Sequence, residues 1–189
     1  FLPVLGAVAL WLLHDTHVVR TSALTITLME LALCVFVLLR FIPESASMQF
    51  TERIQWIPAL GVSYHLGVDG ISVLFVGLTA FLTVLVVVYS WDTIRQQVKL
   101  YMMCLLALET TTMGVFVSLD LILFFVFWEL MLIPSYFLIK LWGGGAERQY
   151  AALKFVLYTL FGSVFMLVGI ALLNINFNHW ASIHHAEHS

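Results

Sequence analysis

A single carboxylate inside a long apolar run constrains this sequence more than any other feature. The run extends from about 119 to 141 and is long enough to cross the hydrocarbon core of a bilayer as a helix. Glu129 lies near its middle, and Pro134 follows within the same run. A charge at that depth costs at least about 2–3 kcal/mol, so intramembrane acids are rare and usually functional. The run therefore predicts a membrane helix that carries a functional glutamate.

The composition indicates that most of the chain lies in a membrane. It is 62% hydrophobic and only 10% charged, with a mean hydropathy of +1.02. Soluble domains are about half apolar and about a quarter charged. The apolar runs are continuous, which favours helices over the alternating strands of a barrel. We expect an all-α integral membrane protein, a multi-pass bundle of about six transmembrane helices. No basic patch suggests a nucleic-acid partner.

Hydropathy divides the chain into four parts. Residues 1–41 hold two membrane helices, and the first begins partway through an apolar run, so we interpret the chain as a truncated N-terminal fragment. Residues 42–69 contain prolines and glycines and predict an extramembrane loop, with a possible β-hairpin. Residues 70–173 hold helices three to six, and residues 174–189 form a polar, histidine-rich tail. The spans after the first are expected at about 22–41, 70–91, 100–118, from the turn at 119–120 to about 142, and 150–173.

The distribution of Lys and Arg predicts the orientation of the chain. The loops after spans one, three and five carry Arg20, Arg95, Lys99, Lys140, Arg148 and Lys154, whereas those after spans two and four carry Arg40 and Arg53. Basic loops stay in the cytoplasm. The 42–69 loop is therefore expected on the periplasmic side of a bacterial inner membrane, or on the equivalent side of a thylakoid or mitochondrial inner membrane.

Three further ionisable side chains fall within spans: Glu30, Glu109 and Lys154. Glu109 lies ten residues before Leu119 and Glu129 ten residues after it, so a tight hairpin turning there places both at one depth. A buried carboxylate whose cationic partner moves can capture and release a proton. Glu129, Glu109 and Lys154 are the candidate proton-transfer residues. Lys154 lies near the interface, where snorkelling explains it as well.

Two other residues inside the spans, Glu30 and Pro134, have structural explanations. Glu30 is explained by helix packing, since no second signal supports a function for it. Pro134 removes the hydrogen bond to the carbonyl of Leu130, beside Glu129, and predicts a helix kink.

Several other site classes do not fit. All histidines lie in loops or at chain ends, whereas a haem-binding bundle needs them inside its helices. The tail histidines at 179, 184, 185 and 188 favour a solvated segment over a metal site. Both cysteines lie inside apolar runs without a CxxC motif, and the sequence has no GxGxxG or P-loop. We expect no cofactor and no metal in this chain.

Four segments together resemble a known family. They are YHLGVDGIS (64–72), LALETTTMGVF (106–116), SLDLILFFVFWELMLIPSYFLIKLWGG (118–144) and YAALKFVLYTLFGSVFML (150–167). They resemble the antiporter-like, proton-pumping membrane subunits of respiratory complex I, in particular the subunit M type, which corresponds to mitochondrial subunit four.

The resemblance implies a fold of about fourteen helices with inverted repeats. It implies no redox centre here, with flavin, iron–sulfur clusters and quinone in other subunits. The implied partners are those other membrane subunits, including neighbouring antiporter-like ones, and the lipid bilayer. Glu129 matches the family's fifth-helix glutamate, whose partner is a seventh-helix lysine that this chain does not reach. Glu109 matches an assisting fourth-helix glutamate, and Lys154 a sixth-helix lysine.

The expected function is thus proton translocation as a subunit of an NADH- or ferredoxin:quinone oxidoreductase. Three alternatives remain open. The chain can belong to a related cation/proton antiporter or membrane-bound hydrogenase, to the photosynthetic variant coupled to CO2 uptake, or to a non-conducting scaffold subunit.

Overall fold

The computed structural model describes residues 2–45, 47–58 and 61–186, with side chains up to Phe177. Its elements are α1 (Leu2–Leu12), α2 (Thr16–Arg40), β1 (Gln49–Ile57), β2 (Val62–Val68), α3 (Ser72–Thr93), α4 (Val98–Val117), α5 (Leu121–Leu130), α6 (Leu132–Trp142) and α7 (Arg148–Ala186). Five segments of this described part are long and apolar enough to cross a membrane, with α5 and α6 forming one of them. The protein is a multi-pass helical membrane protein.

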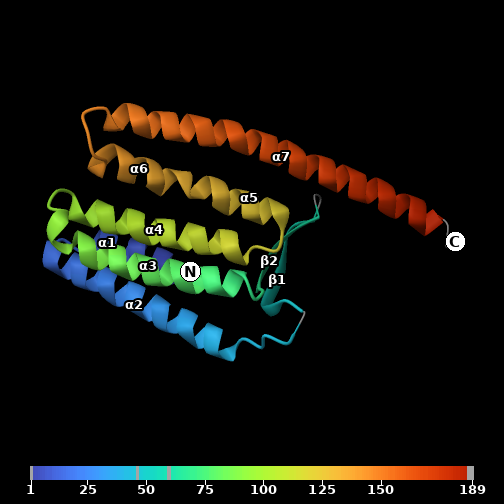
Figure 1. Cartoon of the computed structure of the whole chain (residues 1–189), viewed down its shortest axis with the longest axis horizontal. Coiled ribbons are helices and arrows are strands. Elements are labelled where there is room, and N and C mark those ends of the chain that lie inside the picture. The colour runs from blue at the N-terminus through green and yellow to red at the C-terminus, as the bar shows by residue number, and fades with distance from the viewer. Residues whose placement is uncertain (1, 46, 59–60, 187–189) are drawn as a thin grey trace.

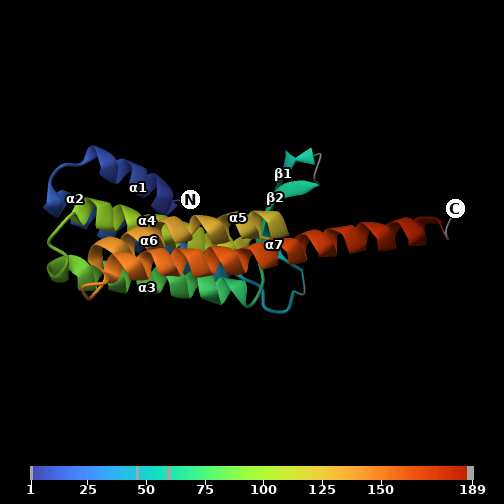
Figure 2. The same ribbon diagram turned by 90° about the horizontal axis from the view of Figure 1, so that it is seen from above.

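The helices lie side by side, with α4 at the centre of the bundle (Figure 1). Helix α4 packs against α1, α2, α3, α5 and α6. Helix α7 packs along α6 and α5 at the edge and extends beyond the bundle, and α1 covers one face (Figure 2). The central position of α4 explains why its buried residues surround the helix axis rather than forming one stripe.

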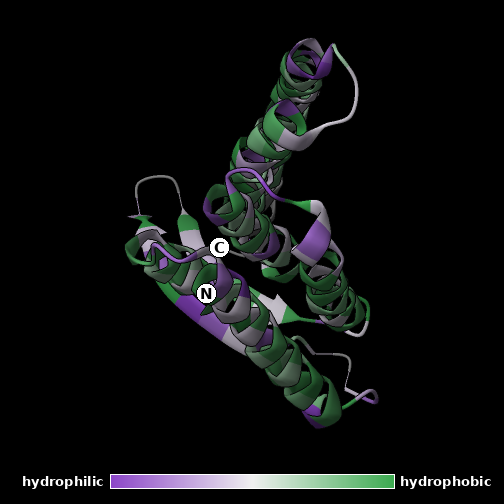
Figure 3. Cartoon of the chain, turned by 90° about the vertical axis from the view of Figure 1, so that its left-hand side faces the viewer, coloured by the Kyte–Doolittle hydropathy of each residue, from purple (hydrophilic) through white to green (hydrophobic). Residues whose placement is uncertain are grey.

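The outer surface of the bundle is apolar, as a bilayer requires. Figure 3 shows hydrophobic residues around the helices and hydrophilic ones concentrated in the connecting segments at the end that faces the viewer. Helix α7 illustrates this, because Phe161 and Phe165 are 68% and 63% exposed on it. Lipid tails solvate such side chains as well as a protein core does.

At one end of the bundle, basic and indole groups bind backbone carbonyls at or near helix C-termini. The side chains of Arg20, Lys99, Trp142 and Arg148 donate to the carbonyls of Ile94, Trp11, Gln96 and Leu141, respectively. The last turns of a helix leave carbonyls without intrahelical partners, and the C-terminal dipole favours cations. These bonds tie α1, α3 and α6 to neighbouring elements.

At the opposite end, the loop between α2 and α3 forms the antiparallel hairpin that the sequence allowed. In it β1 pairs with β2, and Arg53 lies opposite His65. Asp120 joins this hairpin to the bundle, since its Oδ1 accepts from the N–H of Ile122 at 2.9 Å and its Oδ2 from the N–H of Ser63 at 2.9 Å. One carboxylate therefore caps α5 and docks the hairpin.

Helix boundaries differ from the sequence expectation in two places. Helix α2 begins at Thr16 rather than near 22, because Asp15 caps it by accepting from the N–H of His17 at 2.8 Å. The 174–189 tail was expected to be a polar tail beyond the last helix, but α7 continues to Ala186. Residues 174–189 contain neither Gly nor Pro, the residues that most often end a helix. Ile175 and Phe177 also continue the apolar character of the preceding span.

Replacing Gly114 on α4 by Ala is expected to destabilise the protein. A Cβ at this position would lie 2.3 Å from Cδ1 of Phe127 on α5, so the two helices must move apart. We expect a loss of about 1–3 kcal/mol. Thermal unfolding measures it, using a thiol-reactive dye that labels the buried Cys34 and Cys104 only on unfolding. The matched control is Gly77→Ala on α3, which has open space around its Cβ position and should not lower stability. Equal midpoints for both variants would contradict the close contact.

Replacing Asp120 by Ala is expected to lower the free energy of unfolding by about 1–3 kcal/mol. The variant loses the cap of α5 and leaves the N–H of Ser63 without its acceptor. Limited proteolysis of the hairpin should also speed up, because its docking bond is gone. The control is Glu44→Ala in the exposed connection before β1, for which neither readout should change.

Candidate functional site

Glu129 lies in the last turn of α5, immediately before a break in the fifth span. The helix stops at Leu130, Met131 forms a turn, and α6 starts at Leu132. Among the described residues, the buried Oε1 of Glu129 has no hydrogen-bond partner. The structure thus places an unpaired carboxylate oxygen beside interrupted backbone.

The break has a local cause in the sequence. Pro134 has no N–H to donate to the carbonyl of Leu130. The next residue, Ser135, donates its hydroxyl to the carbonyl of Met131 at 2.8 Å. Its N–H makes a longer bond of 3.4 Å to the same oxygen. From α4, the hydroxyl of Thr112 donates to the sulfur of Met131 at 3.5 Å. The Ser135 hydroxyl therefore reinforces a long backbone bond close to Glu129.

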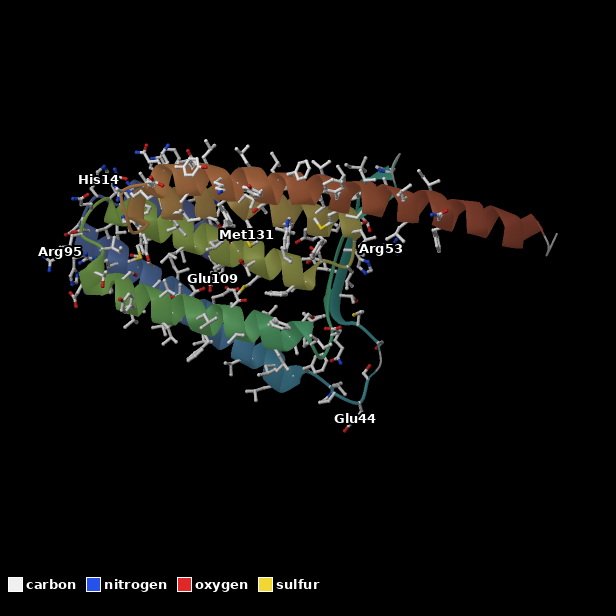
Figure 4. All side chains as sticks on the ribbon, turned by 45° about the horizontal axis from the view of Figure 1, so that its top comes forward. His14, Glu44, Arg53, Arg95, Glu109 and Met131 are labelled. Carbon is white, nitrogen blue, oxygen red and sulfur yellow. The ribbon has the colours of Figure 1, made fainter. Side chains whose placement is uncertain are left out.

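Glu109 lies at the centre of the bundle, on α4 (Figure 4). Its side chain is only 2% exposed, and within the described structure neither carboxylate oxygen has a hydrogen-bond partner. The Thr83 hydroxyl of α3 lies beside this carboxylate, but donates to the carbonyl of Thr79 at 2.9 Å. An unpaired buried carboxyl is costly, which is typical of a group retained for function.

Glu30 on α2 is a second buried acid, for which the sequence gave no function. It is 9% exposed, and its Oε2 has no hydrogen-bond partner among the described residues. The buried stripe of α2 consists of Val19, Ala23, Thr27, Glu30 and Cys34. This helical repeat of small and polar residues in a Val/Leu-rich span marks a packed face, and it is the signal that would have placed Glu30 inside the bundle.

The structure keeps the tight hairpin from which the equal depth of Glu109 and Glu129 was predicted. Helix α4 ends at Val117, eight residues after Glu109, and α5 begins at Leu121, eight residues before Glu129. The close approach of Gly114 to Phe127 and the bond from Thr112 to Met131 hold the two helices together. The equal depth of the two carboxyl groups stays a prediction.

Lys154 does not join the glutamates. Its ammonium lies over the rings of Tyr150 and Tyr158, with distances of 5.8 and 5.7 Å to their centroids. The buried residues Ala152 and Ser163 mark the face of α7 that packs on the bundle, and Lys154 is exposed on another face. A cation held between two aromatic rings near a helix start is typical of the membrane interface.

The structure describes no alternative metal site. In the described part of the chain, no three His, Cys, Asp or Glu side chains come together in a way that could hold a metal ion. The tail histidines at 179, 184, 185 and 188 lie outside the described side chains, so the solvated-tail interpretation stays a prediction.

Replacing Glu109 by Leu is expected to stabilise the fold. The change removes a buried carboxyl that lacks a hydrogen-bond partner in the described structure and substitutes an apolar side chain of similar size. The expected gain is about 1–3 kcal/mol in the free energy of unfolding, measured by the same thiol-labelling method. Glu147→Leu, at an exposed loop position, is the control and should change stability little. A large loss of stability in the Glu109 variant would show that the carboxyl supports the fold.

Comparison with known proteins identifies the family of this site. Residues 118–186, which include Glu129, match the transmembrane family described as NADH:quinone oxidoreductase/Mrp antiporter. NADH-quinone oxidoreductase subunit M of Rickettsia conorii is 45% identical over 136 residues, covering 72% of this chain and 27% of that protein. Subunit M of Rhodobacter capsulatus is 49% identical over 148 residues, which cover 78% of this chain and 28% of that protein. The chain thus spans little more than a quarter of these relatives.

A solved structure shares the fold. The archaeal membrane-bound sulfane sulfur reductase complex contains a chain that matches 93% of this one with a TM-score of 0.76 at 18% identity, and 27% of that chain is covered. The helix arrangement around Glu109 and Glu129 is therefore a shared architecture. Sequence and fold together show that the chain belongs to the antiporter-like membrane subunits of the NADH:quinone oxidoreductase/Mrp antiporter family.

Proposed function

We propose that this chain is part of a proton-translocating subunit of an NADH-quinone oxidoreductase, and that Glu129 is its principal proton-transfer group. The relatives named subunit M, at 45% and 49% identity, support the assignment to this complex. Flavin, iron–sulfur clusters and quinone would then reside in other subunits, and neighbouring membrane subunits would be the partners.

The observation that carries the proposal is the unpaired carboxylate oxygen of Glu129 at the helix break. A carboxylate oxygen that no protein donor occupies stays available as an acceptor for a proton. Pro134 also leaves the carbonyl of Leu130 without its helical donor, and ordered water can satisfy such a carbonyl inside a membrane helix. Both features lie within the segment that matches the family.

A route for the proton follows from the two ends of the bundle. His14 and Arg95 mark the basic end, and Glu44 and Arg53 lie at the hairpin end (Figure 4). With the basic end in the cytoplasm, protons enter there, reach Glu129 at mid-depth and continue along the bundle. Thr112 follows Glu109 on α4 by three residues, and its hydroxyl contacts Met131, two residues after Glu129, which supports a route between the two glutamates along this contact.

Lys154 has a different place in this proposal. Its position between Tyr150 and Tyr158 at the start of α7 supports a role at the entry side rather than next to Glu129. The carboxylates, and not this lysine, form the interior part of the route.

The test is Glu129→Gln in the full-length subunit, assembled in its complex and reconstituted in vesicles. Glutamine keeps the size of the side chain but cannot carry the proton. We expect normal assembly and electron transfer to quinone in an uncoupled membrane, with proton pumping lowered at least tenfold.

The control for this experiment is Glu52→Gln, an exposed position on β1, which should pump at the wild-type rate. If Glu129→Gln assembled and pumped like the control, the chain would be a scaffold and the proposal would be wrong. Pumping that required Na⁺ rather than protons would instead support the antiporter alternative.

A further inference from the structure

The hydroxyl of Thr112 makes a different contact from those of its neighbours on α4. Thr110 donates to the carbonyl of Leu106 on its own helix at 2.9 Å, and Thr111 bonds in the same way. Thr112 donates instead to the sulfur of Met131, at the end of α5, at 3.5 Å. A thioether sulfur is only a weak acceptor, whereas a helix offers its hydroxyls a carbonyl oxygen. The contact therefore reflects how α4 and α5 are placed against each other.

Met131 is the junction between the two halves of the fifth span. Figure 4 shows it within the bundle, away from both ends. Its N–H bonds the carbonyl of Phe127 at 3.1 Å, and its carbonyl accepts the hydroxyl of Ser135 at 2.8 Å. Together with the bond from Thr112, these contacts hold Met131 from α4, α5 and α6 at once. The orientation of this residue thus decides how α6 continues from α5.

Two contacts fix the last turn of α5 against α4. Phe127 and Met131 are one turn apart on the same face of α5. Phe127 lies so close to Gly114 that a Cβ at this glycine would be 2.3 Å from its ring. Met131 accepts the hydroxyl of Thr112. Two anchors on one face define the rotation of a helix about its axis, which a single anchor leaves free. Glu129 lies between the two anchors in the sequence, so the same turn carries it.

The turn needs this second anchor because the helix break weakens it. Pro134 leaves the carbonyl of Leu130 without its helical donor, and the N–H of Ser135 makes only a long bond of 3.4 Å. Backbone hydrogen bonds therefore restrain the junction less than they restrain an unbroken helix. The side-chain contact of Met131 takes over part of this restraint. The direction of Glu129, whose buried Oε1 has no hydrogen-bond partner in the described structure, depends on it.

We propose that Thr112 and Met131 are positioning residues for Glu129. Their hydroxyl–sulfur contact sets the rotation of the last turn of α5, and with it the direction of the carboxyl group. This role rests on the proposed function, in which Glu129 transfers the proton. Neither positioning residue carries the proton itself, because neither side chain is titratable. They act by holding the carboxyl group in one place, since a displacement of about 1 Å is enough to slow a transfer that depends on alignment.

The test uses the complex with the full-length subunit, reconstituted in vesicles. Thr112→Val keeps the shape of the side chain and removes the donor, and Met131→Leu removes the acceptor. We expect each variant to assemble and to lower the number of protons pumped per electron about threefold or more. The double variant should lose no more than either single one, because both substitutions remove the same contact. Thr112→Ser keeps the hydroxyl and should restore most of the pumping.

A spectroscopic readout separates positioning from a general loss of stability. The infrared band of the Glu129 carboxyl group is identified by difference against Glu129→Gln. Its frequency should change in Thr112→Val and in Met131→Leu. The matched control is Thr111→Val, which removes a hydroxyl that bonds within α4 and should alter neither pumping nor the band.

The positioning role is wrong if Thr112→Val and Met131→Leu pump like the Thr111→Val control. It is also wrong if they pump poorly while the Glu129 band stays unaltered, since the contact would then be structural only. Normal pumping by Glu129→Gln would overturn the proposed function and this role with it. Loss of pumping in Glu129→Gln but not in Thr112→Val would overturn the positioning role alone, so the two failures are distinguishable.

Discussion

The constraint on which this structure depends is that a bilayer offers no water to buried polar groups. Every carboxylate, carbonyl and hydroxyl inside the bundle must find its partner within the protein. Threonine and serine hydroxyls meet the requirement by bonding their own helix, as Thr110 does with the carbonyl of Leu106 at 2.9 Å. The glutamates do not meet it in this way. Glu30, Glu109 and Glu129 each keep at least one buried oxygen without a hydrogen-bond partner among the described residues, and the proposed role of Glu129 rests on this feature.

Helix α4 connects these three carboxylates. It carries Glu109, it packs on α2 near Glu30, and its Thr112 contacts the helix break beside Glu129. Its central position requires small residues where neighbours come close, and Gly114 against Phe127 is such a place. Helix α4 therefore provides tight packing at Gly114 and an unpaired buried carboxyl group at Glu109. The contacts that stabilise the bundle and the groups that are costly to bury lie on different turns of this helix.

Much of the fold was predictable because hydropathy alone determines which segments enter a membrane. The spans and the tight turn between α4 and α5 followed from the sequence, whereas the role of Glu129 stays a prediction. The sequence did not predict which side of each helix faces which neighbour. The rotation of a helix about its axis depends on packing against other helices, and hydropathy does not report this packing. For this reason the sequence did not show that Glu30 is buried in the bundle, or that the ammonium of Lys154 lies over the rings of Tyr150 and Tyr158.

The bonds at the basic end of the bundle have a consequence for how this protein is made. Arg20, Lys99 and Arg148 are among the charges from which the sequence predicts the orientation of the chain, and in the structure they bind carbonyls at the ends of α3, α1 and α6. With the predicted orientation, the same side chains would fix the side of a loop and cap the neighbouring helix. A segment inserted the other way round would then lose its caps together with its sidedness.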